Sequence, residues 1–135
     1  MEERFQIAKE KGCQGIEPDN VDGWDNETGF SLTKDDSEEY LTFLSAAAHN
    51  LDLLIGLKNS AEIASTMQPN FDFAVVEECK KYKECNKYSV FIENDKPVFA
   101  IECRKKKKKL CRKVKKKLKF SLIFGNYSLK KLQLC

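Results

Sequence analysis

Short apolar runs alternate with mixed polar segments along the first 103 residues. Four of the runs are brief and end abruptly in polar residues, as expected of strands that are covered on both faces of a sheet. They span residues 15–17, 53–57, 71–76 and 97–101. The segments before and between them read as helices over residues 2–11, 33–50, 60–67 and 80–94. The pattern therefore predicts an α/β fold in which helices and strands take turns along the chain.

Two of the predicted helices begin at residues whose side chains are suited to capping. Thr33 is expected to be an N-cap, because its hydroxyl can accept from the first backbone N–H groups of the helix. Asp35 and Asp36 then fall in the first turn, where the helix dipole favours negative charge. Ser60 is expected to cap the short helix that runs to Met67.

Polar side chains follow every predicted strand at its carboxyl end. The alternation is typical of βαβ units, whose right-handed crossovers bring these ends to one edge of a parallel sheet. Active sites of parallel α/β proteins are built at that edge. The polar residues at the strand ends are Glu17, Asp19, Lys58, Asn59, Glu77, Glu78 and Glu102. Together they predict an acidic cleft with one lysine.

The stretch over residues 12–23 carries the densest of these signals. Pro18 cannot donate a sheet hydrogen bond, so it marks the end of a strand, and Asp19 opens a long loop that runs to Thr33. Asp19 and Glu77 follow two different strands and could act as the carboxylate pair that glycoside hydrolysis uses. The alternative is a solvated acidic loop whose Asp and Asn side chains bind turn amides.

Three other residues in or near this stretch have more than one interpretation. Trp24 could be a platform for a sugar ring or an aromatic cover over the end of a barrel. A calcium loop aligned on Gly23 would need carboxylates at Pro18 and Gly29, so this reading is rejected. His49 lies on a predicted helix away from the strand ends, and we expect it to be structural.

Charge divides the chain into two parts near residue 103. The net charge is +3 overall, but residues 1–103 carry 10 Lys/Arg against 21 acidic residues, or −11, and residues 104–135 carry 14 Lys/Arg and no acid, or +14. We expect a folded α/β domain over 1–103 and a basic, low-complexity tail over 104–135 that is disordered or partly helical and does not continue the βα order. Such a tail could bind polyanions, but residues 104–119 contain no aromatic side chains for base stacking, so nucleic acid is not an expected partner.

The six cysteines do not have the spacing of a zinc site, since there is no Cys-x-x-Cys and only one histidine. Cys79 and Cys85 could close a small disulfide loop, or they could be buried free thiols. The first residues have no basic start followed by an apolar run, so no signal peptide is visible. No apolar run has the roughly 18 residues that a membrane span needs.

Several collinear motifs over residues 4–103 resemble one known family, glycoside hydrolase family 114, the endo-α-1,4-polygalactosaminidase-like enzymes of fungi and bacteria. Residues 11–23, KGCQGIEPDNVDG, are similar to the family signature KGCDGVEPDNVDGY. Further similarities follow in the family's order: residues 28–33 (TGFSLT), 48–49 (AH), 55–59 (IGLKN), 71–79 (FDFAVVEEC) and 96–99 (KPVF), followed by Glu102.

The resemblance implies a secreted, α-galactosidase-like TIM-barrel glycosidase that cleaves α-linked galactosamine polymers and needs no cofactor or metal. In that family an Asp and a Glu act as the catalytic pair in a retaining reaction. They map onto Asp19 as nucleophile and Glu77 as acid and base. The substrate is then expected to contact the neighbouring polar and aromatic residues at the strand ends: Glu17, Asn20, Asp22, Trp24, Lys58, Asn59 and Glu102.

The departures from the family imply a partial (β/α)8 barrel of about four βα units, roughly strands 4 to 7. The family's first three strands are expected to be missing, and its last strand to be replaced by the non-homologous Lys-rich tail. Val76 also stands where the family has Asn. Four strands cannot close a barrel, so we expect open sheet edges that favour self-association and a catalytically weak or inactive monomer. A non-catalytic sugar-binding remnant is the alternative.

Overall fold

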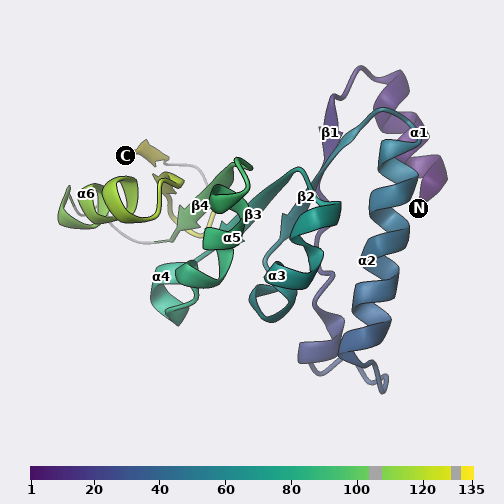
Figure 1. Ribbon diagram of the computed structural model, residues 1–135, viewed down its shortest axis with the longest axis horizontal. Coiled ribbons are helices and arrows are strands. Elements are labelled where there is room, and N and C mark those ends of the chain that lie inside the picture. Colours follow the sequence, from purple (N-terminus) through teal and green to yellow (C-terminus); the bar gives the residue numbers. More distant parts are fainter. Residues whose placement is uncertain (104–107, 129–131) are drawn as a thin grey trace. The chain divides into compact units, whose positions relative to one another are not determined.

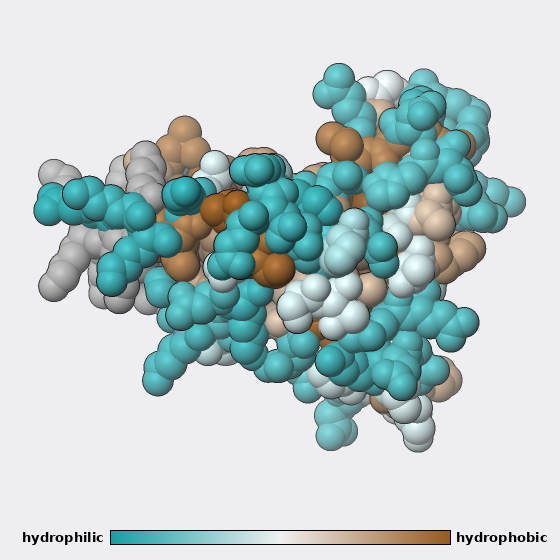
Figure 2. Space-filling model, viewed as in Figure 1, coloured by the Kyte–Doolittle hydropathy of each residue, from teal (hydrophilic) through white to brown (hydrophobic). Residues whose placement is uncertain are grey.

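The computed structural model describes residues 1–103, 108–128 and 132–135, and forms two compact units (Figure 1). The first unit spans residues 1–72 and the second spans residues 73–135. Both are built from strands that alternate with helices, which confirms the predicted α/β class. Hydrophilic residues cover most of the surface that is shown in Figure 2. None of the helices in the described ranges has the length and apolar content that a membrane span requires.

The first unit pairs two parallel strands and packs helices beside them. Its helices and strands are α1 (Glu2–Glu10), β1 (Gly15–Ile16), α2 (Lys34–His49), β2 (Leu54–Lys58) and α3 (Ala64–Met67), with 3-10 turns η1 (Gly23–Asp25), η2 (Ala61–Ile63) and η3 (Gln68–Asn70). Gly15 pairs with Leu54 and Ile16 with Ile55. A Cβ at Gly15 would lie 3.1 Å from the Leu54 carbonyl oxygen, so glycine allows this close approach of the two strands.

Helix α2 forms where the sequence predicts it, and for the predicted reason. Thr33 and Asp36 form a capping box: the Thr33 hydroxyl accepts from the Asp36 N–H at 3.2 Å, and the Asp36 carboxylate accepts from the Thr33 N–H at 2.7 Å. The apolar side of α2 is buried with residues of α1, β2 and the turns that follow β2. The buried apolar residues include Phe5, Leu41, Leu44, Ala48, Leu53, Ile55, Leu57, Ile63 and Met67.

The described residues of the second unit form three parallel strands and one short antiparallel strand. Its elements are β3 (Phe73–Glu77), α4 (Cys79–Tyr82), the 3-10 turn η4 (Cys85–Tyr88), α5 (Ser89–Glu93), β4 (Val98–Glu102), α6 (Lys108–Lys117), β5 (Ser121–Phe124) and β6 (Gln133–Leu134). Strand β4 lies between β3 and β5 and is parallel to both, whereas β6 is antiparallel to β5.

Side chains of these strands alternate between two faces of the sheet, as the pleat requires. One face is buried and contains Ala74, Val76, Val98, Ala100, Glu102, Leu122 and Phe124. The opposite face is more open and contains Phe73, Val75, Glu77, Phe99, Ile101 and Ile123. Glu77 pairs with Ile101 in the register, so Glu77 and Glu102 fall on opposite faces.

The chain after residue 103 continues the βα order in the described residues, where the sequence led us to expect that the order stops. Helix α6 buries Cys111 and Val114, and β5 pairs along β4. Cys111 forms a disulfide with Cys135, which the sequence did not predict. The prediction of an open edge beside β4 is therefore wrong, because β5 occupies it. The part of the predicted tail at residues 104–107 and 129–131 lies outside the described residues.

Two local predictions also need correction. Ser60 does not cap a helix with its side chain: its φ is 59°, and its hydroxyl donates to the Lys58 carbonyl at 3.2 Å. Residues 80–94 do not form one helical segment but the separate elements α4, η4 and α5. Lys83 ends α4 in a left-handed conformation with φ 66°, which a continuous helix cannot contain.

Replacing Thr33 with Ala should lower the free energy of unfolding by about 1 kcal/mol, because the Asp36 N–H loses its capping acceptor. Urea unfolding followed by circular dichroism measures the change. Thr66→Ala, at an exposed position of α3, is the matched control and should leave stability nearly unchanged. Equal losses in both variants would contradict a specific role for the capping box.

Candidate active site

A buried lysine organises the carboxyl ends of β1 and β2. The Lys58 side chain is 8% exposed, and its Nζ lies 2.9 Å from Asp19 Oδ1 and 3.8 Å from Glu17 Oε1. Burial of an ammonium group is unfavourable unless carboxylates compensate its charge. The structure therefore brings together three of the residues that the sequence placed at this edge, two from the end of β1 and one from the end of β2.

Asp19 is held as a carboxylate by this arrangement. The hydrogen bond from Lys58, aided by a hydrogen bond from the Asn20 backbone and by the charge of Lys58, lowers the pKa of Asp19 below its ordinary value, although partial burial opposes the shift. Its Oδ1 accepts from Lys58 at 2.9 Å and from the Asn20 N–H at 2.9 Å. The Asp19 side chain remains 57% exposed, so an ionised oxygen can meet a ligand from solvent.

Left-handed backbone conformations follow each of the first three strands. Asn20 (φ 55°) follows β1, Asn59 and Ser60 (φ 50° and 59°) follow β2, and Glu78 (φ 52°) follows β3. Such conformations are costly for residues other than glycine and cluster at functional sites. Each of these residues is next to a polar residue that the sequence placed at a strand end: Asn20 follows Asp19, Asn59 follows Lys58, and Glu78 follows Glu77.

The loop after Asp19 is anchored rather than freely solvated. Val21 is buried, and the Asp22 carbonyl accepts from the Asn26 side chain at 2.8 Å. Trp24 is half-buried, and its indole N–H is buried without a hydrogen bond in the described part of the chain. The geometry leaves both readings of Trp24, as a platform and as a cover, as predictions.

In the second unit, Glu77 and Glu78 end β3 with opposite exposure. Glu77 is exposed on the open face of the sheet, whereas the Glu78 side chain is only 11% exposed. Glu78 Oε2 lies 2.7 Å from Lys81 Nζ, and Tyr127 Oη lies 3.4 Å from Glu78 Oε1. The sequence placed Glu78 at the strand end but did not predict its partners, although the i, i+3 spacing of Glu78 and Lys81 is the signal that could have found the ion pair.

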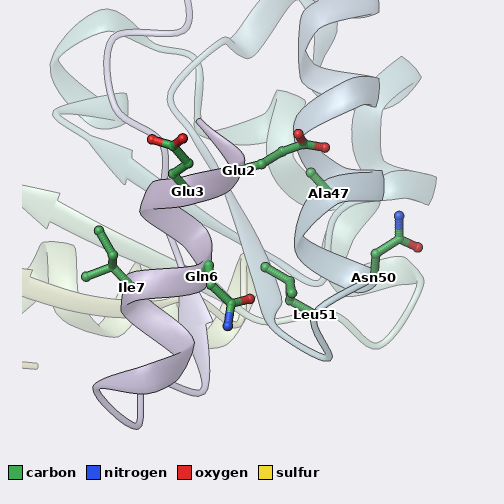
Figure 3. Close-up of a pocket in the computed structure, with 7 residues that line it drawn as sticks. All are labelled: Glu2, Glu3, Gln6, Ile7, Ala47, Asn50 and Leu51. Carbon is green, nitrogen blue, oxygen red and sulfur yellow. The ribbon is translucent and has the colours of Figure 1, made fainter.

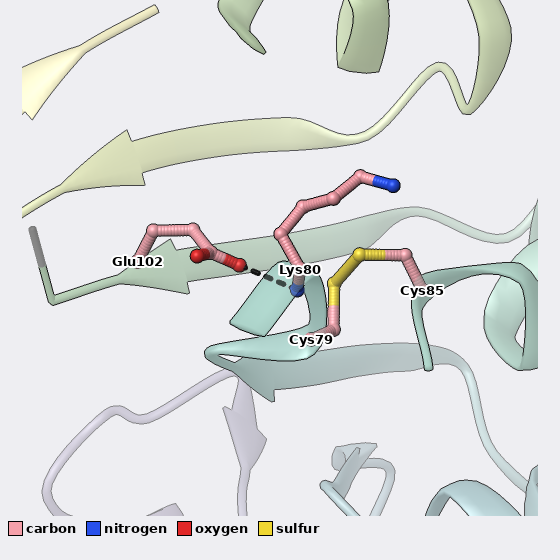
Figure 4. Close-up of a disulfide and its surroundings, with 4 residues drawn as sticks. All are labelled: Cys79, Lys80, Cys85 and Glu102. Carbon is pink, nitrogen blue, oxygen red and sulfur yellow. Dashed lines mark hydrogen bonds between the residues drawn. A yellow bond between two sulfur atoms is a disulfide. The ribbon is translucent and has the colours of Figure 1, made fainter. Parts of the chain in front are cut away.

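Glu102 is fully buried, and one contact explains its position (Figure 4). Its Oε1 accepts from the Lys80 backbone N–H at 2.7 Å, so this carboxylate holds the start of α4. Cys79 and Cys85 are joined in the disulfide that the sequence allowed. Their sulfur atoms lie near the Glu102 carboxylate, but as a disulfide they cannot serve as thiolate ligands of a metal ion.

His49 and Cys103 are not candidates for the reacting groups. His49 Nε2 lies 2.9 Å from Asp72 Oδ2, which also accepts from the Ile55 N–H at 2.8 Å, so His49 is structural as predicted. Cys103 is a half-exposed free cysteine. Partial burial and then the charges of Glu78 and Glu77 raise the pKa of its thiol, which keeps the thiol protonated and unreactive at neutral pH.

A pocket of about 620 Å³ lies between α1 and α2 in the first unit (Figure 3). Its lining combines acidic and amide groups with apolar side chains: Glu2, Glu3, Gln6, Ile7, Ala47, Asn50 and Leu51. None of these residues is at the carboxyl end of a strand, and Leu51 precedes β2. The pocket therefore contains none of the predicted site residues.

Comparisons with known proteins identify the family of this chain. The family model described as "Glycoside-hydrolase family GH114" matches residues 1–135. The chain belongs to glycoside hydrolase family GH114. The GH114 match extends beyond residue 103, so the expectation of a non-homologous tail is not supported. GH114 is a family of glycoside hydrolases.

The whole length of this GH114 chain is similar to part of the crystal structure of Aspergillus fumigatus Ega3 in complex with galactosamine. The TM-score is 0.88 and the sequence identity 36%, and the match covers 100% of this chain and 59% of the Ega3 chain. The glycoside hydrolase domain of PelA from Pseudomonas aeruginosa shares the fold, with a TM-score of 0.63 and 11% identity over 96% of this chain and 60% of that one. A search of curated proteins gave no match. The fold is thus a partial TIM barrel, as predicted.

Replacing Lys58 with Met should raise the pKa of Asp19 toward 3.8, because the main hydrogen bond that lowers it is lost. Carbon-13 NMR titration of the Asp19 carboxyl group measures the shift. The lowered pKa stabilises the wild-type fold above pH 4 or so, and this contribution is lost as the pH falls through the folded pKa. The stability of Lys58→Met should therefore depend less on pH in this acidic range.

Lys34→Met is the matched control, since Lys34 pairs with Glu38 on the surface of α2 at 3.6 Å. It should leave the pKa of Asp19 unchanged. An unshifted Asp19 in Lys58→Met would show that Lys58 does not set the ionisation of this carboxylate.

Proposed function

We propose that this GH114 chain carries the two carboxylates of a retaining glycosidase that cleaves polymers of α-linked galactosamine. Asp19 is the nucleophile, and Glu77 is the general acid and base. The observation that supports this assignment most strongly is the pairing of Asp19 with Lys58, because a nucleophile must be ionised at the pH of the reaction. The galactosamine in the Ega3 structure supports the choice of substrate.

The proposed reaction has two steps. Asp19 attacks the anomeric carbon while Glu77 donates a proton to the departing glycosidic oxygen, which gives a covalent glycosyl-enzyme intermediate. Glu77 then removes a proton from a water molecule, and this water releases the sugar from Asp19 with the original anomeric configuration. Glu77 is exposed, so a proton donor at this position can reach the substrate from solvent.

Lys58 acts as a positioning residue in this scheme. Both hydrogen bonds to the Asp19 carboxylate go to Oδ1, which leaves Oδ2 without a partner among the described residues and available for the attack. We propose that Glu17, Asn20, Asp22, Trp24 and Asn59 contact the substrate around Asp19. Carboxylates in this set suit a polymer whose sugars carry ammonium groups. Glu102 is better explained as a structural residue, because it is fully buried.

The chain spans 59% of the length of the Ega3 chain, so we expect its turnover to be weak. We also expect it to act outside the cell. Two disulfides, Cys79–Cys85 and Cys111–Cys135, support that location, because disulfides persist in oxidising compartments.

Asp19→Asn and Glu77→Gln should each lower the release of reducing ends from an α-1,4-galactosamine polymer by roughly 10²- to 10⁴-fold, since each removes one of the two reacting groups. An aryl α-galactosaminide with a good leaving group separates their roles. Glu77→Gln should still form the glycosyl-enzyme rapidly with this substrate, because the leaving group needs no proton, and added azide should restore turnover. Asp19→Asn should not form the glycosyl-enzyme, and azide should not restore its turnover.

Asp25→Asn is the matched control, because Asp25 is an exposed carboxylate in the same loop as Asp19. It should retain wild-type turnover of both substrates. If the wild-type chain cleaves the polymer and the Asp19→Asn variant binds it without cleaving it, the protein is an enzyme. If wild-type chain binds the polymer but converts neither substrate, the protein is the non-catalytic sugar-binding remnant instead.

A further inference from the structure

An ammonium group in the second unit is surrounded by a carboxylate and two aromatic rings. Lys81 Nζ lies 2.7 Å from Glu78 Oε2, 4.9 Å from the ring centroid of Tyr82 and 6.0 Å from that of Tyr127. Both ring distances fall within the range in which a cation is attracted to an aromatic face. Glu78 and Tyr82 lie at the end of β3 and in α4, and Tyr127 follows β5.

This combination of groups is the one that proteins use to bind cationic ligands. A buried carboxylate supplies charge, and aromatic faces supply the electrostatic attraction that favours ammonium groups. The hydroxyl of Tyr127 also lies 3.4 Å from the second oxygen of Glu78, so the ring and the carboxylate are held together. The cluster is therefore a built cation site, and a side chain of the same protein occupies it.

The four side chains differ in exposure, and the buried member of the ion pair is the carboxylate. Glu78 is only 11% exposed, so its charge needs a permanent counterion, whereas Lys81 is 41% exposed on a flexible stem. Tyr82 is 58% exposed and Tyr127 is 75% exposed, so their rings are open to a ligand. An external ammonium group could thus replace that of Lys81 without leaving Glu78 uncompensated.

We propose that Glu78, Tyr82 and Tyr127 form a subsite for the ammonium group of a protonated amino sugar, and that Lys81 fills this subsite until the sugar displaces it. The site directly follows Glu77 in the sequence. The choice of an amino sugar rests on the proposed function, whereas the preference for a cation rests on the cluster itself. Lys81 then competes with the amino sugar for Glu78, which weakens binding of the sugar. When no sugar is present, Lys81 neutralises the charge of Glu78.

The proposal is tested by titrating the full chain with galactosamine at pH 6, where its amine is protonated, and following the tyrosine ring signals by NMR. Lys81→Met should bind galactosamine about three- to tenfold more tightly than wild type, which is the size expected for loss of a competing ion pair and cation–π contact. Lys81→Gln, which keeps a polar side chain at this position, should give the same gain. Adding Glu78→Gln to Lys81→Met should abolish it.

Lys83→Met is the matched control for net charge, because Lys83 is exposed two residues further along the chain. An equal gain in Lys83→Met would overturn the proposal, since only the total charge would then matter. An equal gain for N-acetylgalactosamine, which has no ammonium group, would overturn it as well. So would weaker binding of galactosamine by Lys81→Met than by wild type. The titration requires no turnover, so failure of the hydrolysis assay would leave its result unaffected.

Discussion

The arrangement of the first unit depends on the need to neutralise one buried ammonium group. Lys58 ends β2 with its side chain almost out of solvent, where an uncompensated charge would cost several kcal/mol. Asp19 and Glu17 supply the compensation, and both come from the segment that follows β1. The ion pairs therefore tie the ends of two neighbouring strands together. They also fix a carboxylate in the ionised form, so one interaction serves both stability and the proposed chemistry.

Left-handed backbone residues next to Asp19 and Lys58 also help to hold the charged groups of the first unit in place. Asn20, Asn59 and Ser60 take left-handed conformations directly beside the paired side chains, and two of these three residues are Asn, which tolerates the conformation best after glycine. The Ser60 hydroxyl bonds the carbonyl of Lys58 itself, so the turn restrains the lysine from its backbone side. Three left-handed residues therefore lie beside the charged groups that must be held, while Gly15 relieves crowding between β1 and β2.

The sequence was most informative where local chemistry decides structure. Pro18, Thr33 and the apolar runs predicted α2 and the carboxyl ends of the first four strands to within one residue, because capping, proline geometry and periodicity act over a few residues. Glu102 shows the limit: the sequence placed it at the correct end of its strand but could not show that it faces away from Glu77. The face depends on the register of β3 with β4, which pairs Glu77 with Ile101.

The region after residue 103 was harder to predict for a different reason. Lysines surround the few apolar residues of α6, so the buried pair Cys111 and Val114 gave too weak a helical pattern among so many charges. Lysine can extend its charged end into water from a packed helix, and composition alone therefore does not distinguish this helix from a disordered tail. The partner of Cys111 lies at the end of the chain, which spacing could not reveal. Tyr127 was missed with this region, and with it the aromatic side of the cation cluster.

Two lysines of this chain illustrate how burial separates a structural ion pair from an exchangeable one. Lys58 is 8% exposed and contacts two carboxylates, whereas Lys81 is 41% exposed and contacts one carboxylate and two rings. At Lys58 the buried member is the lysine itself. A ligand therefore cannot replace Lys58 without moving its buried ammonium group away from Asp19 and Glu17. At Lys81 the buried member is the carboxylate, and any ammonium group of suitable shape can compensate it. The same chemistry would therefore support the proposed catalysis at one position and the proposed ligand recognition at the other.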